Sequence, residues 1–427
     1  MARYIKSTAP LAEAARDDVS RTVSEILSSI EVGGMEAVRK WSERLDGWNP
    51  PSFEISATEL ADAEHQVDDA FKEAYQRSIA AVRGFAEFQK SLLVNGETQL
   101  QPGVTVGQRH VPVQRVGSYL PGGRYPLVSS PLMSVVVPRV AGVDRIVTCT
   151  PPSGGMGINP AMLYAVAACG PDAVFSLGGV PALAAMTFGI GDMGPVDILC
   201  GAGNAYVAEA KRQLFGRVGI DLLAGPSEVA VICDDTASPD LVAADLLGQA
   251  EHGPNSPAYL ISTDEAMAHA VIAEIERQLP ALSTGAVASA AWRDYGVVIV
   301  ADDREDAATA SDDIACEHLE VHAADLDWWH ARLRNYGSLF LGEWSTVTYS
   351  DKGGTGTNHT LPTQRGARYT AGLSVAKFLK AHTYQRVTDP RATRQIAEDA
   401  VAFSLMDALE GHGRTAQMRL DRLSTIE

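Results

Sequence analysis

The sequence is poor in cysteine and contains no pair of cysteines at metal-binding or redox spacing. Its five cysteines are scattered over 427 residues, and none belongs to a Cys-x-x-Cys motif. An odd number without paired spacing excludes a disulfide framework. It indicates small buried side chains in a reducing compartment.

Two further classes of protein are excluded by what the chain lacks. No apolar stretch is long enough to cross a bilayer, and the first residues lack the apolar run of a secretory signal. Positive charge is also scarce, because 35 lysines and arginines stand against 53 aspartates and glutamates, for a formal net charge of −18. Binding to nucleic acid needs a basic surface. We therefore expect a cytoplasmic protein with no nucleic-acid or membrane partner.

What the chain does contain is a long alternation of short apolar runs and helical patterns. The first hundred residues are mostly helical in pattern, and the first amphipathic stretch, residues 11–44, is broken at Gly33 and Gly34. Strands then alternate with helices over residues 145–215 and again over residues 229–341. This alternation predicts parallel sheets covered by helices. The expected fold class is α/β, with two Rossmann-like parallel-sheet domains and helical extensions at both ends.

The domain boundaries follow from the same pattern, since a chain of this length is too long for one core. We expect an N-terminal helical segment in residues 1–22 and a C-terminal helical dimerisation segment in residues 371–427. Between them we expect a discontinuous first α/β domain (23–115 and 229–370) and a second, cofactor-side α/β domain (116–228). The cleft between two such domains is the expected place for an active site.

Two potential metal ligands stand near the end of one predicted helix. Ser238 and Pro239 indicate a helix start, with a hydroxyl that can cap and a proline in the first turn. Three residues separate Gln249 from His252, so both side chains leave one face near the C-terminal end of that helix. An amide oxygen and an imidazole that converge there can hold a divalent metal ion, and a solvated helix face is the alternative.

Glycine-rich turns mark two places where a ligand can approach the backbone closely. Residues 201–204, Gly-Ala-Gly-Asn, lie where a strand turns into a helix, so backbone N–H groups can meet a cofactor phosphate. This turn lacks the third glycine of the usual dinucleotide motif, and an ordinary βα turn is the alternative. The second turn, Gly122-Gly123, is followed by Arg124, which supplies positive charge or is simply solvated.

Carboxylates and imidazoles occur together in three further segments. Histidine titrates near neutrality and is the usual proton shuttle, while a neighbouring carboxylate can activate water. Each pairing has a surface position as its alternative. The three segments are Glu317-His318, the glycine-rich loop 351–359, and Asp407 with His412.

Taken together, these segments resemble the histidinol dehydrogenase family. The resemblance covers nearly the whole chain, in order, and its long motifs are highly specific. The matching stretches are residues 119–123, 201–211, 219–229, 243–252, 316–320, 356–363 and 372–375.

The resemblance implies a zinc-dependent, NAD-linked dehydrogenase that takes a primary alcohol through an aldehyde to a carboxylate. It implies zinc ligands at Gln249, His252, Asp351 and His412, of which His412 comes from the other subunit of an interlocked homodimer.

The same resemblance implies roles for the remaining candidate residues. Glu317 matches the residue that activates water at the aldehyde level, and His318 matches the general base for alcohol oxidation. Substrate contacts are implied at Ser227, His359 and Asp407, and cofactor contacts at Tyr119 and Asn204.

The chain departs from the family pattern at several positions. Pro181 replaces a glutamine that contacts the cofactor, Asp407 replaces a longer glutamate, and Cys316 replaces a proline. The loop around Asp351 is one residue longer, which leaves the register of this aspartate open. Arg124 and its neighbour Tyr125 stand where histidinol dehydrogenases carry small residues.

These departures favour an anionic substrate, because the planar guanidinium of Arg124 suits a sulfonate or carboxylate. The chain also resembles the sulfopropanediol dehydrogenase branch of the family, whose members oxidise 2,3-dihydroxypropane-1-sulfonate to sulfolactate. That resemblance lies at residues 117–125, 253–258, 325–329 and 336–342.

We therefore expect a small anionic alcohol as substrate, with L-histidinol dehydrogenase as the alternative. A catalytically inert relative kept as a binding or scaffold protein is a third possibility, which the full set of matched zinc and acid–base residues disfavours. The choice between NAD and NADP and the number of oxidation steps are left open.

Overall fold

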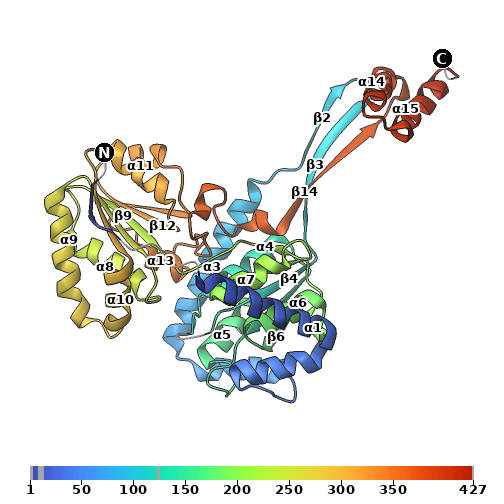
Figure 1. Ribbon diagram of the computed structural model, residues 1–427. Coiled ribbons are helices and arrows are strands. Elements are labelled where there is room, and N and C mark those ends of the chain that lie inside the picture. The colour runs from blue at the N-terminus through green and yellow to red at the C-terminus, as the bar shows by residue number, and fades with distance from the viewer. Residues whose placement is uncertain (1–2, 8–13, 123–125, 426–427) are drawn as a thin grey trace. The chain divides into compact units, whose positions relative to one another are not determined.

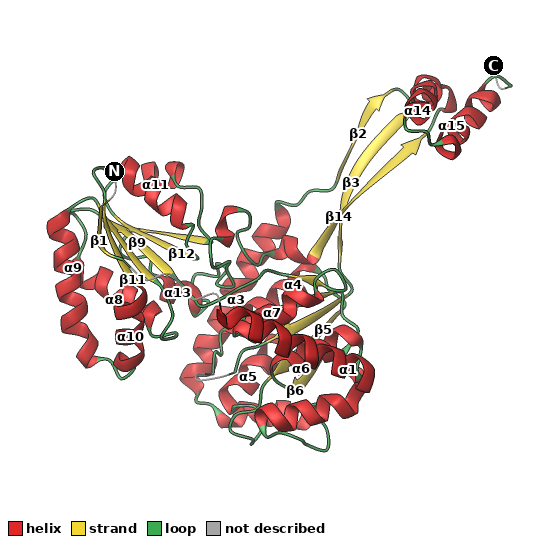
Figure 2. Cartoon of the chain, in the orientation of Figure 1, coloured by secondary structure: helices red, strands yellow, loops and turns green. Residues whose placement is uncertain are grey.

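The computed structural model describes residues 3–7, 14–122 and 126–425, and the chain divides into two compact units. The first unit comprises Met1–Lys90 and Val113–Phe378, and the second comprises Ser91–Pro112 and Leu379–Glu427. The first unit holds two mainly parallel sheets, and the second holds an antiparallel sheet and two helices (Figures 1 and 2). The expected α/β fold class is confirmed.

One sheet of the first unit has six strands in the order β1-β11-β10-β9-β12-β13, all parallel except β1. The strands are β1 (Arg3–Lys6), β9 (Val229–Cys233), β10 (Ala258–Ser262), β11 (Gly296–Val300), β12 (His318–His322) and β13 (Ser338–Leu341). Because sequence order reverses between β9 and β12, this pair forms the switch point of the sheet.

Helices cover both faces of the six-stranded sheet (Figure 1). One face carries α8 (Pro239–Ala250), α9 (Glu265–Gln278) and α10 (Gly285–Tyr295). The other carries α11 (Arg304–Ile314) and α12 (Leu326–Arg332). A short helix, α13 (Val347–Asp351), follows β13.

The second sheet of the first unit has five parallel strands in the order β6-β5-β4-β7-β8, with its switch point between β4 and β7. The strands are β4 (Arg115–Tyr119), β5 (Arg145–Thr150), β6 (Ala173–Ser176), β7 (Ile198–Cys200) and β8 (Gly219–Ile220). Helices α1 (Ala14–Asp46), α6 (Gly179–Phe188) and α7 (Ala205–Leu214) pack on one face, and α5 (Pro160–Cys169) packs on the other.

The remaining helices of the first unit are short or precede the five-stranded sheet. They are α2 (Ala57–Asp62), α3 (Asp69–Ser91), α4 (Val137–Ala141), the π-helical turn Leu132–Val136, and the 3-10 turns Ala63–Gln66, Gly191–Met193, Leu279–Ala281, Gly366–Arg368 and Val375–Phe378. None of the described helices of the chain is long and apolar enough to cross a membrane.

The second unit is built on an antiparallel sheet in the order β14-β3-β2. Its elements are β2 (Gly96–Gln101), β3 (Val104–Pro112), β14 (Leu379–Val387), the 3-10 turn Pro390–Thr393, α14 (Arg394–Met406) and α15 (Glu410–Leu423). The two helices pack against each other.

The observed boundaries differ from the expected ones at two places. Helix α1, kinked at Gly34 where φ is 56°, shares one core with the five-stranded sheet, a core that includes both Ile26 and Phe175. Residues 23–46 therefore pack with residues 116–228 and not with residues 229–370. The C-terminal segment also gains residues 91–112, because β14 needs β3 as its partner, so it is not wholly helical.

Strand β12 carries residues of the site and is buried on both faces. Leu319 and Val321 join the apolar core beneath α11 and α12. On the opposite face, toward α8, the strand presents His318, Glu320 and His322. A strand in a core thus carries three ionisable side chains in a row.

Candidate active site

One pocket of the first unit is lined by residues from both parallel sheets. On one side Pro121 follows β4 and Gly201 follows β7, so this wall is the carboxyl edge of the five-stranded sheet at its switch point. On the other side Ser227 precedes β9, and Glu317 and His318 stand at the start of β12. The wall opposite is therefore the amino edge of the six-stranded sheet. Two α/β sheets meet here, which is where we expect an active site.

Three further pocket residues bring potential metal-ligating atoms to the same place, His252, Asp351 and His359. The Nε2 atom of His252 lies 3.9 Å from a carboxylate oxygen of Asp351, the last residue of α13. The other carboxylate oxygen of Asp351 lies 3.7 Å from His318 Nε2. The Nδ1 atom of His359 is 3.3 Å from the Ser350 carbonyl oxygen, which leaves its buried Nε2 without a hydrogen-bond partner.

The two ligands predicted from helical spacing are arranged differently from the prediction. Helix α8 ends at Ala250, so His252 lies just beyond it and donates its backbone N–H to the Gln249 carbonyl at 3.2 Å. The Gln249 side chain is buried, with its amide nitrogen 3.0 Å from His318 Nδ1. Ser238 holds the N-cap position, but its hydroxyl donates to Glu343 instead of capping the helix.

Burial and nearby charges favour the protonation states that a divalent cation needs in its ligands. Burial lowers the pKa of both His252 and His359, which favours neutral imidazoles. Burial works in the opposite sense on Asp351, yet its contact with His318 lowers the pKa of this carboxyl to about 2. Neutral imidazoles beside an ionised carboxylate, with a buried Nε2 left without a partner, form a ligand set that fits a zinc-class ion.

The residues predicted to act as an acid–base pair, Glu317 and His318, are both held by the backbone of Glu228. The carboxylate of Glu317 accepts the Glu228 N–H at 2.9 Å, and His318 Nδ1 lies 3.1 Å from the Glu228 carbonyl oxygen. His318 turns Nε2 toward Asp351, and this buried atom has no hydrogen-bond partner within the described residues. The arrangement leaves one imidazole nitrogen able to exchange a proton with a bound molecule.

Glu228 itself is a site residue that sequence reasoning missed. Its side chain is buried, and its carboxylate accepts the Gln364 N–H at 3.1 Å. Burial, together with the charge of Glu317, raises the pKa of Glu228 to about 8. Its position directly after Ser227 was the one indication in the sequence.

The residues expected to contact a cofactor stand at the switch point of the five-stranded sheet. Tyr119 ends β4, is buried, and accepts the Gly179 N–H on its hydroxyl at 3.1 Å. Asn204 is the exposed N-cap of α7, and its side-chain oxygen accepts the backbone N–H groups of Tyr206 and Val207. Its amide N–H groups remain available to a ligand.

The glycine turn between β7 and α7 is fixed by a buried ion pair that the sequence analysis did not identify. Gly201 has a φ of 113°, and a Cβ atom there would lie 1.9 Å from the Tyr119 carbonyl oxygen, so only glycine fits. Lys211 donates to the Gly201 carbonyl at 2.9 Å, and Asp221 accepts the Gly201 N–H at 2.8 Å. Lys211 and Asp221 also form an ion pair with each other.

Two predicted site residues belong to the second unit, and a third cannot be placed. Asp407 is the C-cap of α14 and His412 lies in α15, and both are exposed residues of the second unit. Arg124 lies outside the described residues. The first unit alone therefore supplies three of the four expected metal ligands, the acid–base pair and two of the expected substrate contacts.

Comparison with known proteins finds relatives that match nearly the whole chain. A family model described as histidinol dehydrogenase matches residues 10–420. A sulfopropanediol 3-dehydrogenase of Ruegeria pomeroyi is 44% identical, covering 98% of this chain and 96% of its own. A histidinol dehydrogenase of Cereibacter sphaeroides is 42% identical, covering 95% and 93%.

The same kinship is visible in three dimensions. The crystal structure of a histidinol dehydrogenase from Elizabethkingia anophelis matches with a TM-score of 0.92 at 33% sequence identity, over 98% of this chain and 95% of that one. The chain is a member of the histidinol dehydrogenase family.

Proposed function

We propose that this protein is a zinc-dependent, NAD-linked dehydrogenase that oxidises the primary alcohol of a small anionic diol to a carboxylate. The favoured substrate is 2,3-dihydroxypropane-1-sulfonate, which would yield sulfolactate. The observation that carries the proposal is the convergence of the Glu317-His318 pair with His252, Asp351 and His359 in one pocket.

Glu317 and His318 each accept a proton in a different one of two successive oxidations. In the first, His318 Nε2 takes the hydroxyl proton while the carbon loses a hydride. In the second, Glu317 takes a proton from the water that adds to the aldehyde. Per alcohol, one water is consumed and two hydrides leave the carbon, so two molecules of NADH are formed.

Two bound groups complete this chemistry. His252 and Asp351, with Gln249 beside them, would hold the metal, and Asn204 with the glycine turn would meet the dinucleotide. When bound, zinc would supply a Lewis acid and a charge that offsets Asp351, and NAD would accept the hydride. The matched residues of the chain fit both groups.

The preference for an anionic substrate has two sources of support. A relative named as a sulfopropanediol dehydrogenase shares 44% of its residues with this chain. The cationic side chain of Lys352 also lines the pocket, next to Asp351. A positive charge at this position attracts a sulfonate and repels the protonated amine of histidinol. Arg124 is the second candidate for the same role.

A panel of alcohols with the purified protein tests the proposal. NADH formation should be faster with 2,3-dihydroxypropane-1-sulfonate than with L-histidinol, by at least about tenfold in kcat/KM. Two NADH per alcohol would show that oxidation reaches the acid. A preference for L-histidinol would support the alternative function, which the histidinol dehydrogenase of Cereibacter sphaeroides at 42% identity favours. Absence of NADH with every alcohol would support an inert relative.

Substitution of the two cationic residues separates substrate binding from cofactor binding. Arg124→Ala and Lys352→Ala should each raise KM for the sulfonate by roughly ten- to a hundredfold, because a charge-assisted hydrogen bond is lost. KM for NAD should stay the same, and oxidation of a cationic alcohol should improve. A change in KM for NAD alone would place the residue at the cofactor instead.

We further propose that the protein works as a cytoplasmic homodimer in which His412 and Asp407 complete the pocket of the other subunit. All five cysteines are free and buried, which suits a reducing compartment. The second unit, which carries both residues, exposes large apolar side chains of the kind that an interface covers. These include Leu100, Phe403, Leu405, Met406 and Met418.

A further inference from the structure

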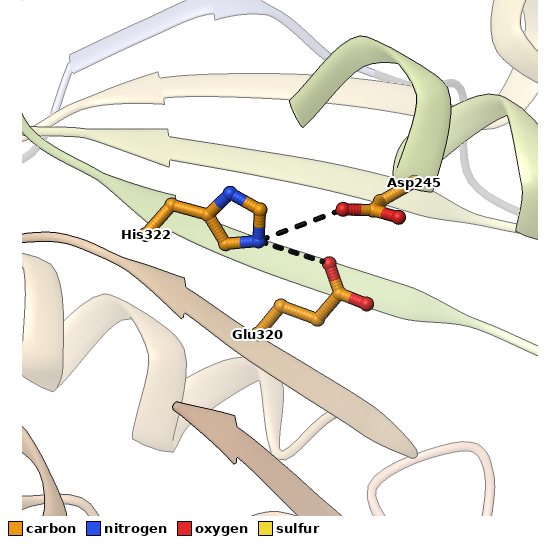
Figure 3. A group of neighbouring side chains, drawn as sticks. All are labelled: Asp245, Glu320 and His322. Atoms are coloured by element: carbon orange, nitrogen blue, oxygen red, sulfur yellow. Dashed lines mark ion pairs between the residues drawn. The ribbon is translucent and has the colours of Figure 1, made fainter. Parts of the chain in front are cut away.

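A second cluster of ionisable side chains lies farther along β12, on the same face as His318. It consists of Asp245 on α8 and Glu320 and His322 on β12. Figure 3 shows the imidazole of His322 with Nε2 directed between the two carboxylates. That nitrogen lies 3.5 Å from Asp245 Oδ2 and 3.4 Å from Glu320 Oε2.

The cluster is buried and its hydrogen bonding is incomplete. Glu320 is 0% exposed and His322 is 2% exposed, while Asp245 leaves 15% of its side chain accessible. Glu320 Oε2 and both ring nitrogens of His322 have no hydrogen-bond partner in the described structure. Buried polar atoms without partners are costly, so native structures rarely leave them. Two of these atoms, Glu320 Oε2 and His322 Nε2, face each other beside Asp245 and indicate a partner that binds between them.

The charge of the cluster points to the kind of partner. Within the described residues, His322 is the only group that forms an ion pair with either carboxylate. Even a protonated His322 balances only one of two negative charges. Burial and the charge of Glu320 raise the pKa of Asp245 to about 7, which reflects this shortage of positive charge. A divalent cation would remove the imbalance.

The distances suit a metal ion better than hydrogen bonds. Hydrogen bonds from N–H to oxygen usually measure about 2.7–3.2 Å, shorter than both contacts of His322. In a tetrahedral zinc site with bonds of about 2.0–2.2 Å, neighbouring ligand atoms are about 3.3–3.6 Å apart. We propose that Asp245, Glu320 and His322 form a second divalent-cation site of zinc type, separate from the pocket around His252 and Asp351.

The remaining contacts of the cluster show what such an ion would stabilise. The second oxygen of Glu320 accepts the Val347 N–H at 2.7 Å, at the start of α13. The second oxygen of Asp245 accepts the hydroxyl of Thr346 at 2.7 Å. An ion here joins α8, β12 and α13, the elements that carry Gln249, His318 and Asp351 toward the pocket. The ion would support the structure of the active site, and it would enter from solvent beside Asp245, the accessible residue of the cluster.

Metal counting on the full-length protein tests the proposal. Chelator-treated wild type, His322→Asn, His252→Ala and the double variant are dialysed against Zn²⁺ and measured by elemental analysis. We expect about two ions per chain in the wild type, about one in each single variant and none in the double variant. His330→Asn is the matched control, because this histidine is exposed on α12 and should leave the count unchanged.

A second variant, Asp245→Asn, and a second metal, Co²⁺, distinguish loss of the site from misfolding and from failure of the proposed function. Asp245→Asn retains the shape of the side chain and should also remove one ion. Co²⁺ bound to the His252→Ala protein should show the visible absorption of a low-symmetry nitrogen–oxygen site. If the pocket takes no metal, the wild type holds one ion, which His322→Asn removes and His252→Ala keeps. Equal metal counts in wild type, His322→Asn and Asp245→Asn would overturn the proposal and indicate a metal-free ion triad.

Discussion

The side chain of His318 lies between two carboxylates that both favour its protonated form. Nδ1 is 3.5 Å from Glu317 and Nε2 is 3.7 Å from Asp351. Burial lowers the pKa of this imidazole, but the two carboxylates together outweigh burial and raise the pKa well above its usual value. A proton acceptor with this environment needs one of the negative charges to be compensated, so the basicity of His318 depends on what binds Asp351.

The separate roles of His318 and Glu317 are testable with two near-isosteric substitutions. His318→Asn should lower the rate of alcohol oxidation by about 10²–10⁴-fold, since general base catalysis is lost. Glu317→Gln should slow the oxidation of added aldehyde more than that of alcohol. Rates with each substrate, together with NAD affinity as the control that should not change, distinguish the two. Equal and mild losses in both variants would contradict the assignment.

A third carboxyl, Glu228, should make stability depend on pH. Its pKa in the folded protein is raised to about 8, while an unfolded chain releases the same proton near its ordinary value of 4.5. Stability from this group is therefore fully present below pH 4.5 and declines as pH rises toward 8. Glu228→Gln keeps the acceptor for Gln364 without the charge. The melting temperature of the variant minus that of the wild type should be higher at pH 8 than at pH 5, by roughly 2 °C or more. A difference that does not change with pH would argue against this.

At the scale of elements, the turn between β7 and α7 depends on the buried ion pair of Lys211 and Asp221. Lys211→Met would leave the Asp221 carboxylate buried without its cation, which costs about 3–5 kcal/mol. We expect a lower melting temperature and a higher KM for NAD, because the Gly201 turn loses a support. The matched control is Arg212→Met, whose exposed ion pair with Glu209 should contribute less than about 1 kcal/mol.

The double variant Lys211→Met/Asp221→Asn gives a further check on that pair. An amide in place of the carboxylate removes the uncompensated charge while it can still accept the Gly201 N–H. Stability should therefore recover part of what Lys211→Met loses. If the double variant is less stable than the single one, charge compensation is not what holds this turn.

Most elements of the two parallel sheets were predictable from the sequence, because their periodicity is strong. The strands Val229–Cys233, Ala258–Ser262 and Ser338–Leu341 lie in the predicted alternation over residues 229–341, and the helix Pro160–Cys169 lies in the one over residues 145–215. Elements with weak apolar patterns were not predicted. Strands β2 and β14 of the second unit are largely exposed, and the two-residue strand β8 is too short to carry a period.

The site was predictable only where its residues lie close in sequence. The spacing of Gln249 and His252 indicated a ligand pair, but the approach of Asp351 and His359 to Glu317 depends on how distant segments pack. The run from His318 to His322 alternates polar and apolar residues, which is typical of a strand with one solvated face. Helices bury both faces of this strand, so its polar face became a chain of buried ionisable groups that the pattern alone does not reveal.

At the scale of the whole molecule, the pocket in the first unit lacks the expected fourth metal ligand and one expected substrate contact. Both residues, His412 and Asp407, stand on the second unit. A symmetric dimer in which each subunit lends these residues to its partner would explain why the second unit exposes so many apolar side chains.

Mixing two inactive variants tests this exchange. His318→Asn and His412→Asn should each be nearly inactive. Unfolded together and refolded as an equal mixture, they should regain about one quarter of wild-type activity, because half of the dimers are mixed and each has one intact site. Refolding of each variant alone is the control. No recovery, although differently tagged subunits co-purify as mixed dimers, would mean that His412 acts within its own chain.

Strand β1 limits how far the N-terminal end of the chain can be shortened without exposing a sheet edge. It is the only antiparallel strand of the six-stranded sheet and covers the outer edge of β11, where Lys6 donates to the Gly296 carbonyl at 2.6 Å. An expression clone trimmed to begin at helix α1 would leave the apolar strand Gly296–Val300 with open N–H and C=O groups, ready to pair with another molecule. For soluble production, crystallisation or tag removal, residues 3–6 should therefore be retained, because they complete the edge of the six-stranded sheet.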